Sequence, residues 1–74
     1  MPRRLRQESA ATALGRRIRQ LRADKGWSQE RLAEHADLDQ NYIAGIEVAR
    51  NTSLKALERL ARALDVRLFE LFRT

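Results

Sequence analysis

Residues 29–47, QERLAEHADLDQNYIAGIE, have the pattern of two short helices joined by a turn of three or four residues. In each half the apolar residues recur at helical spacing, which would place their side chains on one inner face. These residues are Leu32, Ala33 and Ala36 in the first half, and Ile43 and Ile46 in the second. We therefore expect two helices that pack against each other across the turn.

Each of the two predicted helices has its own start signal. Ser28 precedes the first and Asp39 precedes the second, and either side chain can accept a hydrogen bond from a backbone N–H two or three residues later. Ala33 supplies the small side chain expected where two steeply crossing helices come closest. The turn contains Asp37, and aspartate tolerates a left-handed backbone better than most residues other than glycine.

Amphipathic segments flank this pair on both sides. A first helix is predicted to begin between Ser9 and Thr12 and to run to Lys25, where Gly26 can end it. A longer helix follows the pair: Thr52 or Ser53 can cap it, and a break near residues 65–66 separates it from a last helical segment at residues 67–72. The apolar faces are Leu14, Ile18 and Leu21 in the first helix, and Leu54, Leu57, Leu60, Ala61 and Leu64 in the longer one. No strand alternation appears, so we expect an all-α fold of five helices.

The composition is that of one small basic domain. The chain has 74 residues, no cysteine and a formal net charge of +5, with a pI near 11. A disulfide framework and a thiolate metal site are therefore excluded, and a reducing compartment fits. No apolar run approaches a membrane span or a signal peptide, so we expect a soluble cytoplasmic protein. The charge favours a nucleic acid partner, although membranes, acidic proteins or plain solvation could also account for it.

Three segments closely resemble the phage-repressor type of helix-turn-helix protein, the Cro-like or XRE-like transcriptional regulators. They are LGRRIRQLRADKGWSQERLA (14–33), YIAGIE (42–47) and SLKALERLARALDV (53–66). The resemblance runs from Leu14 to about Phe72 and implies a DNA-binding domain whose second motif helix, the recognition helix, enters the major groove. Two positions depart from the family pattern, because Asp37 and Ala49 stand where glycine is common.

Residues at the start of the recognition helix are the candidates for base contact, because that turn lies deepest in the groove. Gln40 and Asn41 carry carboxamides, which can bond adenine in a bidentate manner worth roughly 1–3 kcal/mol of discrimination. The family commonly reads a base at the position of Gln40, whereas Asn41 could equally hold a phosphate. Gly45 either allows close approach to the bases or is simply a tolerated small residue. The full set of candidates is Asp39, Gln40, Asn41, Ala44 and Gly45.

Phosphate contacts are predicted on both sides of the recognition helix. The family places a glutamine that clamps the DNA backbone at the position of Gln29, where the helix N-terminus also favours an anion. The loop after the recognition helix offers a second clamp. Tyr42 could donate to a phosphate or pack beside the recognition helix. The candidates are Gln29, Arg50, Asn51, Thr52, Tyr42, Arg17 and Arg31.

Two further pairings follow from the resemblance and the pattern. In the family, an arginine matching Arg22 pairs with a glutamate matching Glu47, which would tie the first helix to the recognition helix. The last segment carries more apolar residues than one short helix can bury, so we expect Phe69, Phe72 and Leu68 to meet a second subunit in a homodimer. The alternative is that they complete the core of the monomer.

The chain divides into a basic flexible arm, residues 1–9, and a DNA-binding and dimerisation domain, residues 10–74. The arm carries Arg3, Arg4 and Arg6. It could be a disordered terminus, or it could reach into a neighbouring minor groove when DNA is present.

We expect a transcriptional regulator that binds double-stranded DNA as a homodimer on a roughly palindromic operator, with RNA polymerase as a possible further partner. A single histidine, no cysteine and no glycine-rich phosphate loop argue against catalytic residues, a metal site or a cofactor. The main rival is an antitoxin that binds a toxin as well as its own promoter. A phage or plasmid repressor fragment is a third interpretation, although the compact ending at Thr74 leads us to expect a complete domain. Among stand-alone proteins, the chain looks most like the controller proteins of restriction–modification systems.

Overall fold

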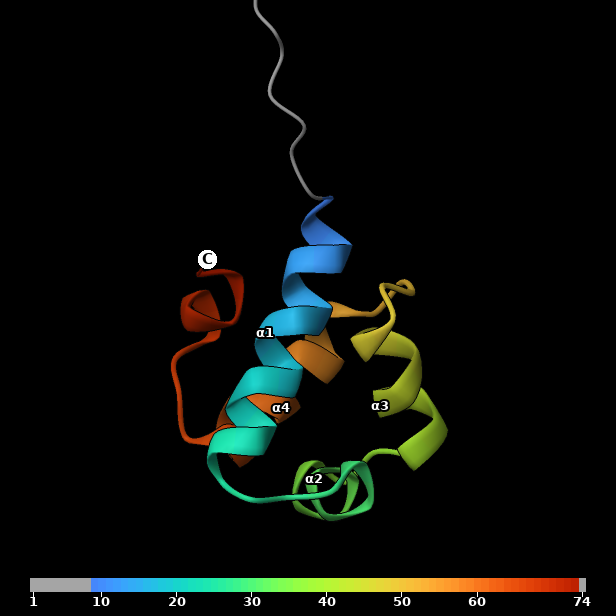
Figure 1. Ribbon diagram of the computed structural model, residues 1–74, viewed down its shortest axis with the longest axis vertical. Helices are drawn as coiled ribbons and strands as arrows, with labels where there is room; N and C mark the ends of the chain where they lie inside the picture. Colours follow the sequence, from blue (N-terminus) through green and yellow to red (C-terminus); the bar gives the residue numbers. More distant parts are fainter. Residues whose placement is uncertain (1–8, 74) are drawn as a thin grey trace, which may run out of the picture.

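The structure is a computed structural model and describes residues 9–73. The predicted arm, apart from Ser9, lies outside the described residues, as does Thr74. The described elements are α1 (Ala10–Asp24), α2 (Gln29–Ala36), α3 (Gln40–Glu47), α4 (Leu54–Leu64) and the 3-10 helix η1 (Leu68–Phe72). Figure 1 shows α1 running along the middle of the domain, with α3 on one side of it and η1 on the other.

The all-α prediction is confirmed for residues 9–73, but the expectation of five α-helices is not. Four α-helices are present, and the last helical segment is a 3-10 helix of five residues. A segment this short forms few of the hydrogen bonds that repay nucleation of an α-helix, and short 3-10 pieces are common in such places. None of the described helices combines the length and the apolarity that a membrane crossing would require.

Local capping explains where the helices begin. The four side chains that cap them accept a hydrogen bond from a backbone N–H two or three residues later, as expected for residues at the N-cap. They are Ser9 for α1, Ser28 for α2, Asp39 for α3 and Ser53 for α4. Of the two candidates for capping α4, Ser53 takes that role, because Thr52 is bonded to Tyr42 instead.

The helix ends use left-handed residues. Gly26 follows α1 with φ 72°, as expected for the glycine that was predicted to end this helix. Asp37 and Asp65 end α2 and α4 at φ 57° and 60°, and Ala49 follows α3 at φ 72°. Alanine has no side-chain group that compensates for this conformation, so Ala49 stores local strain at the end of α3.

The core lies where α1 and α4 face the helix pair. Its fully buried large side chains are Ile18, Leu32, Ile43, Ile46, Leu60 and Leu71. Two residues of the predicted apolar faces differ from expectation. Leu54 is 62% exposed because it is the first residue of α4 and precedes the part of that helix that packs on the core, and Leu21 is only partly buried.

Gly15 marks a close approach of α1 to α3, which the sequence did not reveal. A Cβ atom at Gly15 would lie 2.5 Å from the carbonyl oxygen of Ile46 and 2.9 Å from that of Glu47. Real Cβ atoms do not come this close to a backbone oxygen, and the carbonyls belong to the last turn of α3. The glycine therefore fixes how near the first helix can lie to the recognition helix.

Candidate nucleic-acid interface

Helices α2 and α3 form the two-helix unit expected from residues 29–47. After α2 the N–H of Leu38 donates to the carbonyl of Ala33 at 2.9 Å, which closes the turn around the left-handed Asp37. Leu38 packs against the core, and Ala33 is buried where the helices meet. The orientation of α3 relative to α2 is thus fixed by backbone bonds and by packing.

Arg22 and Glu47 form an ion pair that connects α1 to the last residue of α3. Nε and Nη2 of Arg22 donate to the two carboxylate oxygens of Glu47 at 2.8 and 3.0 Å. Nη1 donates to the carbonyl of Trp27 at 2.9 Å. The Glu47 residue is only 5% exposed, and the hydrogen bond to its carboxylate raises the pKa of Arg22 above its ordinary value. The guanidinium is therefore held charged and in one orientation.

Gln29 belongs to the same network. It is the first residue of α2, and its Nε2 donates to Oε1 of Glu47 at 3.1 Å. A primary amide carries two N–H groups, so this bond leaves the second available for an anion in front of α2. The predicted phosphate contact is consequently held in place by the carboxylate that also binds Arg22.

The first turn of α3 presents polar side chains to solvent. Gln40 and Asn41 are exposed, and their carboxamides have no hydrogen-bond partner among residues 9–73. Asp39 is exposed as well, but its Oδ1 accepts from the N–H of Asn41 at 3.0 Å. Ala44 is half-buried. Two carboxamides are therefore free to bond an external group.

Gly45 differs from the expectation of an open groove-facing position. The residue is buried, and the side chain of Arg50 covers it. It exposes little surface of its own, because the chain turns back after α3 and brings the Arg50 side chain over it.

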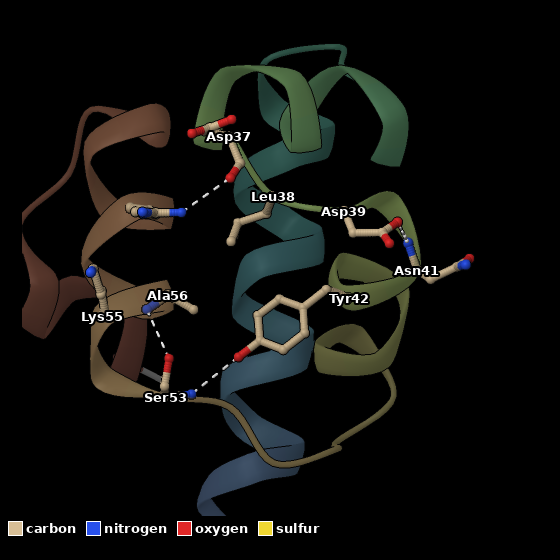
Figure 2. A pocket seen from close by; sticks show the side chains of 9 residues that line it. Asp37, Leu38, Asp39, Asn41, Tyr42, Ser53, Lys55 and Ala56 are labelled. Atoms are coloured by element: carbon tan, nitrogen blue, oxygen red, sulfur yellow. Dashed lines mark hydrogen bonds between the residues drawn. The ribbon is translucent and has the colours of Figure 1, made fainter.

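Tyr42 joins α3 to the loop that precedes α4. Its hydroxyl lies 2.7 Å from Oγ1 of Thr52 and accepts from the N–H of Ser53 at 3.2 Å. The contact with Thr52 is the main cause of a pKa for Tyr42 below its ordinary value of 10.0. Figure 2 shows the ring reaching from α3 to the start of α4. The hydroxyl groups of Tyr42 and Thr52, which were both predicted to contact phosphates, are thus already hydrogen-bonded to each other.

An open groove runs beside Tyr42, between the start of α3 and the start of α4 (Figure 2). Arg59 donates from Nη1 to the carbonyl of Asp37 at 3.2 Å across it. The lining residues are Asp37, Leu38, Asp39, Asn41, Tyr42, Ser53, Lys55, Ala56 and Arg59. Lys55 adds a cation at its rim that the sequence reasoning did not single out.

The loop after α3 carries the remaining predicted phosphate contacts. Arg50 and Asn51 are both exposed, and neither side chain has a hydrogen-bond partner in the part of the chain that the structure describes. These groups, unlike Tyr42 and Thr52, remain available.

The two other arginines predicted to contact phosphates have internal partners. Nε of Arg17 donates to the carbonyl of Glu70 at 3.0 Å, which places it against η1. In Figure 1, η1 lies on the opposite side of α1 from α3. Arg31 is exposed and donates to Nε2 of His35 at 3.2 Å. His35 in turn stacks on Trp27 with ring centroids 4.2 Å apart, a contact that the sequence did not reveal. Arg17 therefore lies apart from the other candidates.

Apolar side chains are exposed at the end of the chain. Phe69 and Phe72 are 63% and 47% exposed, while Leu68 is half-buried against the core and Leu71 is fully buried. The alternative that both phenylalanines complete the core of the monomer does not agree with this exposure.

Comparison with known proteins gives a consistent result. A family model described as helix-turn-helix (HTH_3) matches residues 18–71. The crystal structure of the restriction–modification controller protein C.AhdI from Aeromonas hydrophila has a TM-score of 0.81 and 46% identity, over 84% of this chain and 96% of that one. A hypothetical transcription factor of Neisseria meningitidis is 38% identical over 66 residues, or 88% of this chain and 62% of the relative. Control protein C.MunI from a Mycoplasma species is 42% identical over 60 residues, or 78% of this chain and 81% of the relative. The chain thus spans less than two thirds of the Neisseria relative.

Proposed function

This chain belongs to the helix-turn-helix family, and on that premise we propose that it is a sequence-specific DNA-binding transcriptional regulator. The observation that carries the proposal is the pair of unbonded carboxamides, Gln40 and Asn41, exposed on the first turn of α3. A recognition helix inserts this turn into the major groove, where a carboxamide can bond the N6 and N7 atoms of adenine.

Phosphate contacts flank this reading turn in the proposed complex. Gln29 binds the backbone at the N-terminus of α2, and Arg50 and Asn51 bind it from the loop after α3. Thr52 and Tyr42 support that loop through their mutual hydrogen bond. Arg31 lies on α2 and can add a longer-range attraction. Arg17, which is bound to Glu70, is left out of the interface.

The protein acts as a homodimer in this proposal. Phe69 and Phe72 supply exposed apolar surface on η1, and Leu68 lies beside them. Two-fold symmetry then requires a roughly palindromic operator with half-sites about 34 Å apart. A dimer on a promoter would repress transcription by covering it, or activate transcription by contacting RNA polymerase.

The similarity to C.AhdI and C.MunI supports a more specific role. Both are named as control proteins, and the chain covers 96% of the first and 81% of the second. We accordingly propose that the regulated genes belong to a restriction–modification system.

Two substitutions separate base reading from phosphate binding. Gln40→Ala should weaken binding to the operator by roughly 1–3 kcal/mol and relax the preference at one base pair in each half-site. Arg50→Ala should weaken binding to operator and random DNA alike and reduce the salt slope by about 1. Both are measured by titration of labelled duplexes at several salt concentrations. Equal losses on operator and random DNA for both variants would contradict the assignment.

The dimer is tested by analytical ultracentrifugation. Phe69→Asp should shift the protein to monomers, because it places a charge in the proposed apolar contact. Leu54→Asp is the matched control, since Leu54 is 62% exposed at the start of α4, outside the proposed interface. A dimer that persists in Phe69→Asp would exclude η1 as the interface.

A further inference from the structure

We infer that Gly45 is a positioning residue that seats the side chain of Arg50 against the recognition helix and so directs it to the DNA. The inference rests on the proposed function, and it assigns a cause to the glycine in the last turn of α3. Helix propensity disfavours glycine at such a position relative to alanine.

The backbone at the end of α3 brings Arg50 back over Gly45. The N–H of Arg50 donates to the carbonyl of Gly45 at 2.9 Å, and the N–H of Ala49 donates to that of Ile46 at 3.0 Å. Ala49 has φ 72°. These are the two bonds and the left-handed residue of a Schellman motif, in which side chains at the positions of Arg50 and Gly45 characteristically touch.

The aliphatic stem of Arg50 occupies the space where a side chain of Gly45 would begin. A Cβ atom built there would meet three atoms of Arg50 first: Cδ at 3.3 Å, Cβ at 3.8 Å and Cγ at 3.9 Å. The Cδ distance is tighter than ordinary van der Waals contact, so the stem would have to shift by a few tenths of an ångström. Gly45 is buried as a result of this cover.

The contact with Gly45 holds the stem of Arg50 on the face of α3 that carries Asn41. Gly45 lies four residues after Asn41, so the two share one face of α3. The Arg50 side chain has no hydrogen-bond or ion-pair partner among residues 9–73. A guanidinium that is oriented by its stem but not bonded can bind a phosphate without first breaking another contact.

The decisive variant is Gly45→Ala, measured for DNA binding and for thermal unfolding. It should bind operator and random DNA more weakly, by up to about tenfold if one charge-assisted hydrogen bond is lost completely, and its salt slope should fall by up to about 1. Its melting temperature should equal or exceed that of the wild type, because alanine is the better helix former and the displaced atom belongs to a flexible side chain. A purely structural glycine would not combine unchanged or higher stability with weaker binding.

The double variant Gly45→Ala with Arg50→Ala identifies the route of the effect. It should bind DNA as Arg50→Ala does, with no further loss. An additional tenfold loss in that background would contradict the inference, because the new methyl group would then act on DNA directly. Wild-type affinity in Gly45→Ala, or a lowered melting temperature, would also overturn it. If the wild type bound no DNA at all, the proposed function itself would fail. If Arg50→Ala bound DNA weakly while Gly45→Ala bound it as the wild type does, only the role of Gly45 would be lost.

Discussion

Arg22→Ala should destabilise the domain by about 3–5 kcal/mol, because it leaves the buried carboxylate of Glu47 without its charged partner. Glu47 is 5% exposed and accepts three side-chain hydrogen bonds, two of them from Arg22. The carbonyl of Trp27 loses its bond from Nη1 as well. A domain of this size has a total stability of roughly 4–11 kcal/mol, so the variant should lose a large share of its stability.

The double variant Arg22→Met with Glu47→Leu separates the cost of an orphaned charge from the value of the pair. Both charges are then removed together, and the space is refilled with apolar groups. Its stability should lie within about 1 kcal/mol of the wild type or above it. The ion pair would then matter chiefly for orienting α3 and Gln29, which DNA titration of the double variant can measure.

Urea unfolding followed by circular dichroism, at one fixed protein concentration, supplies the free energies. Arg31→Ala is the control, because Arg31 is an exposed arginine and should change stability by no more than about 0.5 kcal/mol. A loss below about 1 kcal/mol for Arg22→Ala would refute the reasoning, since that is the range of exposed ion pairs.

Three further predictions concern backbone geometry and the tyrosine. Ala49→Gly should raise the unfolding free energy by about 1 kcal/mol, because φ is 72° there. Ala23→Gly, on the exposed face of α1, is the control and should lower it by about 1 kcal/mol. An unchanged urea midpoint in Ala49→Gly would argue against strain. Gly15→Ala should cost roughly 3 kcal/mol despite its better helix propensity, as overpacking against the end of α3, and a stable variant in the same assay would disprove the close approach. Tyr42, the single tyrosine of the chain, should titrate below pH 10.0 in ultraviolet absorbance, and Thr52→Val should raise that midpoint; a midpoint that Thr52→Val leaves unchanged would exclude their hydrogen bond as the cause.

Features set by neighbouring residues could be predicted from the sequence. The caps at Ser28 and Asp39 and the end of α1 at Gly26 depend on side-chain chemistry within a few residues. Asp37 stands where the family commonly has glycine, and aspartate tolerates the left-handed conformation that the structure shows there. The Arg22 and Glu47 pairing came from the family resemblance, because nothing local connects residues 25 positions apart.

Features that depend on packing between distant segments could not be predicted. The close approach at Gly15 and the bond from Arg17 to the carbonyl of Glu70 both join α1 to elements far along the chain. The cover of Gly45 by Arg50 depends on a left-handed Ala49, which is an unfavourable choice for alanine. Among the candidate site residues, these contacts decide which polar groups remain unbonded and which are already used.

Selection of bound sequences from random duplex DNA tests the central claim most directly. A dimer that reads DNA with the first turn of α3 should enrich a roughly palindromic site, with half-sites about 34 Å apart and adenines where the carboxamides of Gln40 and Asn41 reach. The same selection with Gln40→Ala should lose the preference at one position in each half-site. A pool that shows no sequence enrichment, or the same motif for both proteins, would contradict the assignment of α3 as the reading helix.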